Sequence, residues 1–135
     1  MRHRFTTGAV IQLPLGLQYS TSLQANTGKP YSALAGLGGL RNAVRAVDPA
    51  TGRMFPRNSF RSDGLFSWDM RVSKNFTFAG TRSIEVLFEV FNITDTVNFN
   101  RDDYFFDYTS AYFGTPSAIV PNSQRQAQFG ARVRF

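Results

Sequence analysis

Apolar and polar residues alternate along several stretches of this chain, and this period-two pattern limits its fold more than any other feature. Between residues 17 and 26 the odd positions are mostly apolar, whereas every even position is polar. Successive side chains of a β-strand point to opposite faces, so the stretch predicts a strand with one apolar and one polar face. Its ten residues also match the ~9–11 residues that a transmembrane β-strand needs.

Four further stretches alternate in the same way. The strands predicted from the pattern are residues 4–13, 17–26, 65–74, 83–91 and 126–135. A tight turn at Pro14–Leu15–Gly16 joins the first two, because Pro and Gly favour the bend. A second turn near residues 78–80 joins the third and fourth strands. We predict a register centred on residue 78 for that hairpin, which places Arg71 opposite Glu85 and avoids facing like charges.

The connections between these strands alternate between short and long. They span residues 14–16, about 27–62, about 75–82 and about 94–123. Short turns at one end and long loops at the other are typical of an outer-membrane barrel, with periplasmic turns and extracellular loops. A soluble β-sandwich would need two structureless loops of about thirty residues in a small compact domain, which is uncommon. The pattern therefore favours an all-β, antiparallel, up-and-down transmembrane β-barrel segment of about five strands.

Composition removes most enzyme classes. The chain has no Cys and a single His, so thiolate catalysis, disulfides, Cys-based zinc sites and His-pair metal motifs are excluded. We expect no catalytic residues, no cofactor and no metal site. The net charge is +6, but the Arg residues are dispersed with no run of three and match no nucleic-acid-binding motif. We therefore expect no nucleic-acid partner, and interpret the Arg residues as lumen or loop charges.

The polar faces of the predicted strands supply candidate lumen-lining residues. These are Gln18, Gln24, Asp69, Arg71, Glu85, Glu89, Arg132 and Arg134. Glu85 and Glu89 share a face but lie about 13 Å apart along a strand, farther than the ~5–9.5 Å of a glycosidase carboxylate pair. Polar lining with Arg71 as a partner is the better interpretation. The apolar faces carry Tyr19, Phe66, Trp68 and Phe76 as candidate girdle aromatics, although Trp68 falls in mid-strand.

The long loops offer one candidate ligand-contacting cluster. Its acidic and aromatic residues are Asp102, Asp103, Tyr104, Phe105, Phe106 and Tyr108. Packing of the loops on themselves is the competing interpretation of these residues. In the first loop, residues 33–47 show near-helical spacing of apolar residues with Gly and Ala interruptions, which predicts a loop with at most a helical turn. Residues 75–77 and 92–94 match the glycosylation sequon by chance.

Several segments together resemble the late barrel of TonB-dependent outer-membrane receptors, especially the Oar-like type. They are His3–Phe5, Leu13–Gly16, Thr27–Tyr31, Arg57–Gly64, Asp69–Phe76, Phe88–Thr94, Val97–Phe99 and Gln124–Phe135. The resemblance implies that residues 1–135 form the C-terminal part of a larger barrel, without its plug. It also implies an assembly signal in Phe129, Ala131, Val133 and Phe135, read by the barrel-assembly machinery through strand pairing.

We therefore expect barrel strands of a TonB-dependent receptor for ligand uptake in the outer membrane of a Gram-negative-type bacterium. Outer-membrane lipid, the remaining barrel strands, the plug and the TonB complex are the partners that the resemblance implies. Two alternatives stay open. One is an oligomeric or smaller outer-membrane barrel that serves as a pore or a structural protein, and the other is a soluble all-β binding module.

Overall fold

The computed structural model describes residues 2–35, 44–78 and 82–135 of the chain and contains no α-helix in these ranges. The described residues form two compact units, which we treat separately. The sheet unit comprises Arg4–Ala25, Phe66–Val97 and Asn122–Phe135. The loop unit comprises Met1–His3, Asn26–Leu65 and Asn98–Pro121, and belongs mainly to the two long connections.

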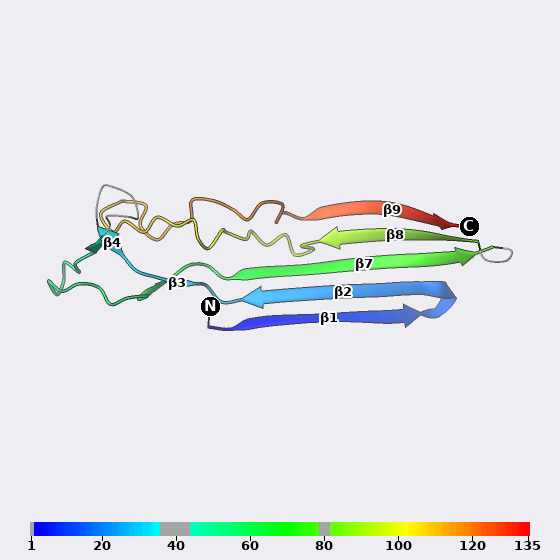
Figure 1. Cartoon of the computed structure of the whole chain (residues 1–135), viewed down its shortest axis with the longest axis horizontal. Helices are drawn as coiled ribbons and strands as arrows, with labels where there is room; N and C mark the ends of the chain where they lie inside the picture. Colours follow the sequence, from blue (N-terminus) through cyan, green and yellow to red (C-terminus); the bar gives the residue numbers. More distant parts are fainter. Residues whose placement is uncertain (1, 36–43, 79–81) are drawn as a thin grey trace. The chain divides into compact units, whose positions relative to one another are not determined.

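The sheet unit is built on five long strands in the order β1-β2-β7-β8-β9 (Figure 1). Their bounds are β1 Arg4–Leu13, β2 Leu17–Asn26, β7 Leu65–Thr77, β8 Ser83–Phe91 and β9 Gln126–Arg134. Neighbouring strands run in opposite directions, and the two outermost strands, β1 and β9, point the same way (Figure 1). The five strands predicted from the alternation are confirmed, with β7 extending three residues beyond its predicted end.

The first turn is a short 3-10 helix at Pro14–Gly16, which confirms the predicted bend. Pro14 begins it, and Leu15 and Gly16 adopt φ values of 66° and 72°. Left-handed backbone is easy for Gly but costly for Leu, which the closed turn holds in place. The N–H of Leu17 donates to the carbonyl of Pro14 as β2 begins.

The second hairpin has a different register from the one predicted. Arg71 lies opposite Glu89, and Glu85 lies opposite Asn75, so the hairpin is centred two residues later than residue 78. The N–H of Phe78 donates to the carbonyl of Arg82, and residues 78–82 connect the two strands, a shorter connection than the predicted 75–82. Residues 79–81 of the predicted turn lie outside the described part. The charge argument was wrong because the long Arg71 side chain reaches both carboxylates, so their attraction does not distinguish the two registers.

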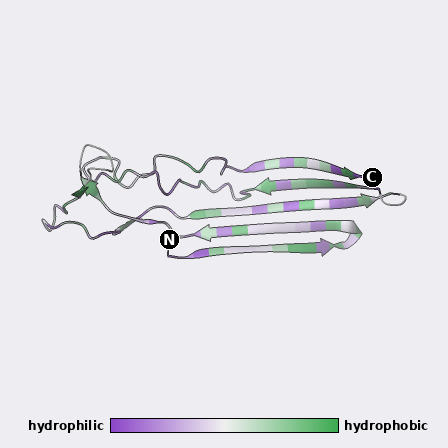
Figure 2. Ribbon diagram, in the orientation of Figure 1, coloured by the Kyte–Doolittle hydropathy of each residue, from purple (hydrophilic) through white to green (hydrophobic). Residues whose placement is uncertain are grey.

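The two faces of the sheet differ in polarity, and the alternation is visible most clearly along β7 and β9 in Figure 2. Four paired rows of β7, β8 and β9 make the apolar face: Met70–Val90–Ala127, Val72–Phe88–Phe129, Lys74–Val86–Ala131 and Phe76–Ile84–Val133. The rows between them make the polar face: Arg71–Glu89–Gln128, Ser73–Leu87–Gly130, Asn75–Glu85–Arg132 and Thr77–Ser83–Arg134. A one-residue slip would exchange the faces, so this register keeps the charges together.

The loop unit has a small core of its own, made by both long connections. Ala33, Ala46 and Tyr104 are its buried apolar residues. Around them stands a cluster of aromatic rings with centroids 4.7–6.2 Å apart, which we call the aromatic cluster. Its members are Tyr31, Phe55, Phe60, Tyr104, Phe106, Tyr108 and Phe113. The connections are therefore folded, rather than structureless as the loop-length argument assumed for them.

Short strand pairs give the loop unit its order. β3 (Pro30–Tyr31) pairs with β6 (Phe60–Arg61), and β4 (Leu34–Ala35) pairs with β5 (Val44–Arg45). Residues 36–43, the middle of the segment predicted to contain at most a helical turn, lie outside the described residues. The second long connection joins through Leu34, which donates to Phe106 and accepts from Tyr108 through the backbone at 2.8 Å each.

A close backbone approach explains the glycine that precedes β3. A Cβ atom on Gly28 would lie 1.7 Å from the carbonyl oxygen of Ser62, a distance that no side chain tolerates. Only Gly lets the two backbones meet here. The same contact brings the N–H of Lys29 to the Ser62 hydroxyl at 3.0 Å.

Candidate functional site

The apolar face of the sheet unit has the dimensions of a membrane-facing surface. Phe66, Trp68, Met70, Val72 and Phe76 follow one another on this face of β7. At about 3.4 Å per residue and a tilt of about 40°, the stretch from Phe66 to Phe76 spans about 26 Å, close to the ~25 Å apolar band of outer-membrane barrels. Phe129 on β9 is 74% exposed, so water would meet a large apolar surface here.

Two polar groups on the apolar face are satisfied within the sheet. The indole N–H of Trp68 donates to the Thr21 hydroxyl at 2.8 Å, and that hydroxyl donates to the carbonyl of Asp69 at 3.0 Å. This bonding lets Trp68 occupy mid-strand rather than a membrane interface, where Trp usually finds polar partners. The Lys74 ammonium turns towards Phe76 and lies 5.0 Å from its ring centroid. Its long apolar stem remains on the face, as a snorkelling Lys allows.

A row of ion pairs, which we call the charge ladder, crosses the polar face of β7, β8 and β9. It consists of Arg71, Glu85, Glu89 and Arg132. The Arg71 guanidinium lies 3.4 Å from a Glu85 oxygen and 3.5 Å from a Glu89 oxygen. Glu85 also pairs with Arg132 at 3.6 Å, and Glu89 accepts a hydrogen bond from the Gln128 amide. Two guanidinium groups thus balance two carboxylates. The expected partnership of Arg71 with the two carboxylates is confirmed, whereas sequence reasoning missed Gln128, which the register alone brings opposite Glu89.

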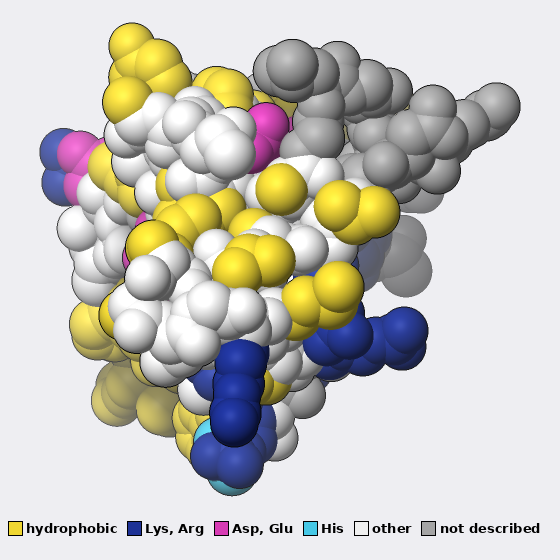
Figure 3. Space-filling view, turned by 90° about the vertical axis from the view of Figure 1, so that its left-hand side faces the viewer, with side chains coloured by type: hydrophobic (Ala, Val, Ile, Leu, Met, Phe, Trp, Pro, Cys, Tyr) yellow, Lys and Arg dark blue, Asp and Glu magenta, His cyan; other side chains and the backbone are white. Residues whose placement is uncertain are grey.

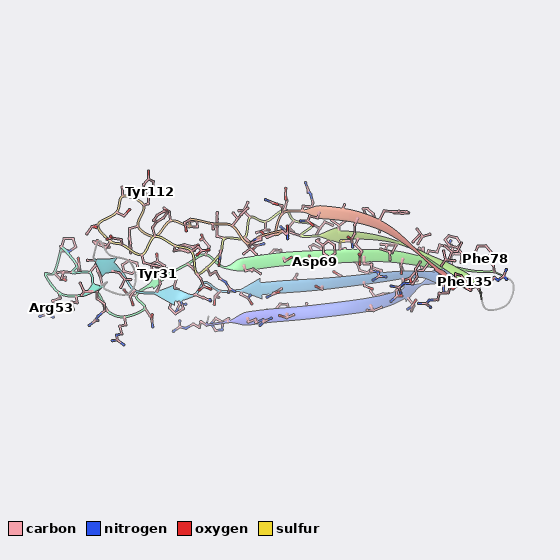
Figure 4. The ribbon with its side chains drawn as sticks, turned by 45° about the horizontal axis from the view of Figure 1, so that its top comes forward. Tyr31, Arg53, Asp69, Phe78, Tyr112 and Phe135 are labelled. Carbon is pink, nitrogen blue, oxygen red and sulfur yellow. The ribbon has the colours of Figure 1, made fainter. Side chains whose placement is uncertain are left out.

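The other predicted lining residues also fall on this face. Arg134 lies opposite Ser83 in the row next to the short turn. The bond between Thr21 and Trp68 places the odd residues of β2 on the apolar face, so the even residues Gln18 and Gln24 lie on the polar one. Asp69 occupies a polar-face position of β7 (Figure 4). Its carboxylate accepts from the Ser67 hydroxyl at 3.1 Å and from the Asn92 N–H at 2.9 Å, so it holds the end of β8.

The side chain of Asn92, which follows β8, forms a hydrogen-bond network that the sequence did not predict. We call it the Asn92 network. The side chain donates to the carbonyls of Thr96 and Ser123 and accepts from the Thr94 hydroxyl and the Thr96 N–H. The residue is 2% exposed and has a φ of 47°, which Asn tolerates better than most residues. With both amide hydrogens engaged, Asn92 does not present a free amide, in keeping with a chance sequon match.

The acidic and aromatic residues of the second connection are divided between core and surface. Tyr104, Phe106 and Tyr108 belong to the aromatic cluster, and Tyr104 is only 6% exposed. Their rings pack the loop unit, so the self-packing interpretation holds for them. Phe105 is exposed and lies 5.7 Å from the ring of Tyr112, which points outward in Figure 4.

The acidic members of that group have partners within the loop unit. Asp102 forms an ion pair with Lys29 at 2.7 Å, and Asp103 accepts from the side chain of Asn100. Hydrogen bonds from Thr109, which follows it by two residues, hold the pKa of Asp107 below its usual range. Asp107 was not among the predicted contacts. In the described ranges no group of three or more His, Asp or Glu residues could hold a metal ion.

Tyr104 and Asp63 are joined by two hydrogen bonds in the loop unit. The Tyr104 hydroxyl donates to the Asp63 carboxylate at 2.7 Å and accepts from the Asp63 N–H at 2.8 Å. Burial, together with the hydrogen bond to this carboxylate, raises the pKa of Tyr104 to about 12. Burial also raises the pKa of Tyr31, whose ring lies 5.9 Å from that of Tyr104. Both phenols therefore stay neutral and hold the two connections together.

A comparison with protein families now adds to this geometry. The family described as outer membrane beta barrel domain matches residues 21–128, which is most of the chain. The chain belongs to this family. A search of curated proteins and a search of solved structures found no match. The family places this outer membrane β-barrel domain in the bacterial outer membrane, as predicted, and supports the membrane alternatives over a soluble binding module.

Within the described residues, the sheet of this outer membrane β-barrel domain is open. β1 and β9 are its edge strands, and every residue of β1 is exposed. In the described ranges, no helix is long and apolar enough to cross a membrane.

The residues predicted as an assembly signal lie at the C-terminal edge of the sheet. Phe129, Ala131 and Val133 are on the apolar face of edge strand β9, where another strand could pair with them. Phe135 follows them, and a shallow hollow lined by Phe78, Ile84, Val133 and Phe135 lies at this end of the sheet unit (Figure 4). Their role as an assembly signal stays a prediction.

Proposed function

We propose that this outer membrane β-barrel domain supplies C-terminal barrel strands to a TonB-dependent receptor that takes up ligands across the outer membrane. The observation that carries the proposal is the two-faced sheet, with both long connections leaving the same end of its strands. The segments that resemble such receptors include β7, β8, β9 and the Asn92 network. The family assignment supports the barrel, and the resemblance supports the transport role.

In this proposal the two faces have different partners. The apolar face contacts outer-membrane lipid, and the polar face with its charge ladder faces the lumen and the plug. The remaining strands pair with the edges of β1 and β9, the barrel-assembly machinery reads the apolar residues of β9, and the TonB complex supplies energy through the plug. The contribution of this chain is architectural rather than catalytic.

The open edges leave one alternative, a barrel formed by several copies of the chain. Strand direction argues against it. β1 and β9 point the same way, so copies arranged around a common barrel axis would join through parallel strands (Figure 1). Outer-membrane barrels of single bacterial chains are antiparallel and even-numbered. Additional strands of the same polypeptide, odd in number, would close the sheet without a parallel junction.

Cross-linking in the outer membrane distinguishes the two assemblies. The chain has no Cys, so cysteines introduced by Ala9→Cys on β1 and Ala131→Cys on β9 provide unique edge positions on one face when the rest of the polypeptide contributes none. For the receptor, a bis-maleimide should give no multiples of the single polypeptide's mass. A ladder of such multiples would support the oligomer. A matched pair, Ala9→Ser with Ala131→Ser, controls for non-specific cross-linking.

The transport role needs a second measurement on the intact protein. An antibody against the loop unit should isolate, from outer membranes, one longer polypeptide that contains a plug. The purified periplasmic domain of TonB should bind that polypeptide. Isolation of a 135-residue polypeptide only, or failure of the TonB domain to bind, would contradict the receptor proposal while leaving the membrane location intact.

A further inference from the structure

Among the described residues, four arginines of the loop unit have no acidic partner. Its acidic side chains are all engaged elsewhere: Asp48 with Ala50 and Thr51, Asp63 with Tyr104, Asp102 with Lys29, Asp103 with Asn100, and Asp107 with Thr109. Among the described residues, no carboxylate lies within ion-pair distance of Arg45, Arg53, Arg57 or Arg61. Residues 36–43 contain no Asp or Glu. The first long connection therefore has an excess of positive charge.

Strand pairing places two of these arginines on one face. Tyr31 and Phe60 are paired and their rings stack in the aromatic cluster, so Pro30 and Arg61, the next pair, point to the opposite, outer face. Ala33 is buried, and its carbonyl accepts from the N–H of the buried Ala46. The next pair, Leu34 and Arg45, lies on the opposite face of β4 and β5 from Ala33 and Ala46, and Arg45 is half-buried there. Arg61 and Arg45 flank positions 30 and 34 of one continuous segment, about 13 Å apart along it.

Backbone carbonyls orient both guanidinium groups without neutralising them. Arg45 donates to the carbonyl of Phe55 at 3.2 Å, and Arg61 donates to that of Gly28 at 3.5 Å. A guanidinium has five N–H donors, so each retains several for another acceptor. Arg57 is exposed in the turn between them, next to Asn58, whose N–H donates to the Ser32 hydroxyl. In Figure 3, most of the Lys and Arg side chains in view lie in its lower half, and one lies at the left beside an acidic side chain.

We propose that this arginine face, defined by Arg45, Arg57 and Arg61, binds a soluble ligand that carries two or more phosphate or carboxylate groups. Oriented guanidinium groups recognise such groups by paired hydrogen bonds, and their spacing suits a molecule with separated acid groups rather than a single small anion. The binding itself stands on the loop unit alone. That it selects the cargo of the transporter rests on the proposed function.

Calorimetric titration of the full chain in a non-ionic detergent tests the binding. Inositol hexakisphosphate and a polygalacturonate oligomer are the probes, and a neutral malto-oligosaccharide is the negative control. We expect saturable binding of at least one anionic probe that weakens as salt is raised, because ion pairing with an exposed face is screened. The double variant Arg45→Gln/Arg61→Gln should lose at least tenfold in affinity.

Arg53 provides the matched control. It is exposed in the same connection, but it lies in the turn that follows Asp48 and at the far end of the loop unit (Figure 4). Arg53→Gln should change the affinity less than twofold. An equal loss for Arg53→Gln would reduce the effect to net charge and overturn the proposal, as would the absence of binding to both anionic probes. Binding to vesicles with anionic lipid, but to neither soluble probe, would assign the face to a membrane surface instead.

A second variant guards against misfolding. Arg57 makes no described side-chain hydrogen bond, so Arg57→Gln should leave the fold unchanged and still weaken binding by about threefold to tenfold. Circular dichroism checks the fold of each variant. If the chain binds an anionic probe but the intact receptor does not take that probe up, the result contradicts the transport role alone. If the unmodified chain inserts into the membrane but binds neither anionic probe, the result contradicts the arginine face alone.

Discussion

The hydroxyl of Tyr104 accepts a hydrogen bond from the Asp63 N–H and donates one to the Asp63 carboxylate. Tyr104→Phe removes both and leaves a part-buried N–H without its partner, which costs roughly 1–3 kcal/mol. We expect the loop unit to be destabilised by this amount, measured as faster hydrogen exchange of the Asp63 amide. Tyr112→Phe, at an exposed ring, should change the exchange little. An unchanged Asp63 amide would show that the bond contributes nothing.

The same pair predicts an alkaline transition. Tyr104 has a folded pKa of about 12 and an ordinary pKa of about 10, so its contribution is fully present below pH 10 and is lost as the pH rises through about 12. The contribution is on the order of 2 kcal/mol. Stability of the loop unit should therefore fall between pH 10 and 12, with tyrosinate absorbance rising in the same interval. Tyr104→Phe should remove the part of the tyrosinate absorbance that appears at the highest pH. If that part persists in the variant, the assignment to Tyr104 is wrong.

Asn92 offers a sharper test of one side chain. Asn92→Ala removes four side-chain hydrogen bonds and places Ala at a φ of 47°, so we expect a loss of at least about 2 kcal/mol. Asn122→Ala is the matched control because Asn122 has a φ of 57° but makes no described side-chain hydrogen bond. Denaturant unfolding in detergent compares the two. Equal losses would attribute the effect to backbone strain alone.

At the scale of the strand, sequence reasoning succeeded where the structure is periodic. Alternation predicted the long strands closely because one face of each must be apolar along its whole length. The register of β7 against β8 was wrong because it depends on turn length, which alternation does not encode. Arg71 reaches Glu85 and Glu89 together, so charge could not select the register either.

Neighbouring positions of β9 allow a direct test of the two faces. Phe129→Arg places a charge on the apolar face, whereas Gln128→Arg places it beside Glu89 on the polar face. Because Phe129 is 74% exposed within the sheet unit, its replacement costs little unless lipid covers it. We expect Phe129→Arg to lower the amount of assembled protein in the outer membrane, since Arg near the bilayer midplane costs ~2–4 kcal/mol.

Gln128→Arg should assemble at close to the level of the unmodified protein, because Glu89 accepts the new cation. Heat-modifiable mobility on gels and outer-membrane fractionation measure the folded amount. Equal tolerance of both variants would refute the assignment of the faces, and greater damage from Gln128→Arg would reverse it. The two positions are neighbours on one strand and receive the same charge, on opposite faces of the sheet.

At the scale of the whole molecule, the sequence predicted the sheet unit far better than the loop unit. The aromatic cluster joins residues as distant as Tyr31 and Tyr104, and no periodic pattern marks such long-range contacts. The sequence predicted ligand contacts at Tyr104, Phe106 and Tyr108 because their segment was considered without the other connection. Most of their ring contacts are with Tyr31 and Phe55 of the other connection, so the chemistry of the short segment could not reveal their role.

The shared core also predicts that the two connections unfold together. Phe60→Ala removes a half-buried ring that contacts Tyr31, Phe55 and Phe113, at a cost of about 1–3 kcal/mol. We expect hydrogen exchange to accelerate in residues 44–62 and 98–120 alike, whereas β8 and β9 keep their protection because their pairing lies within the sheet unit. Phe105→Ala, at a more exposed ring, is the control. Acceleration in one connection alone would show that each loop is stable without the other, and acceleration throughout β8 and β9 would show that the sheet depends on the aromatic cluster.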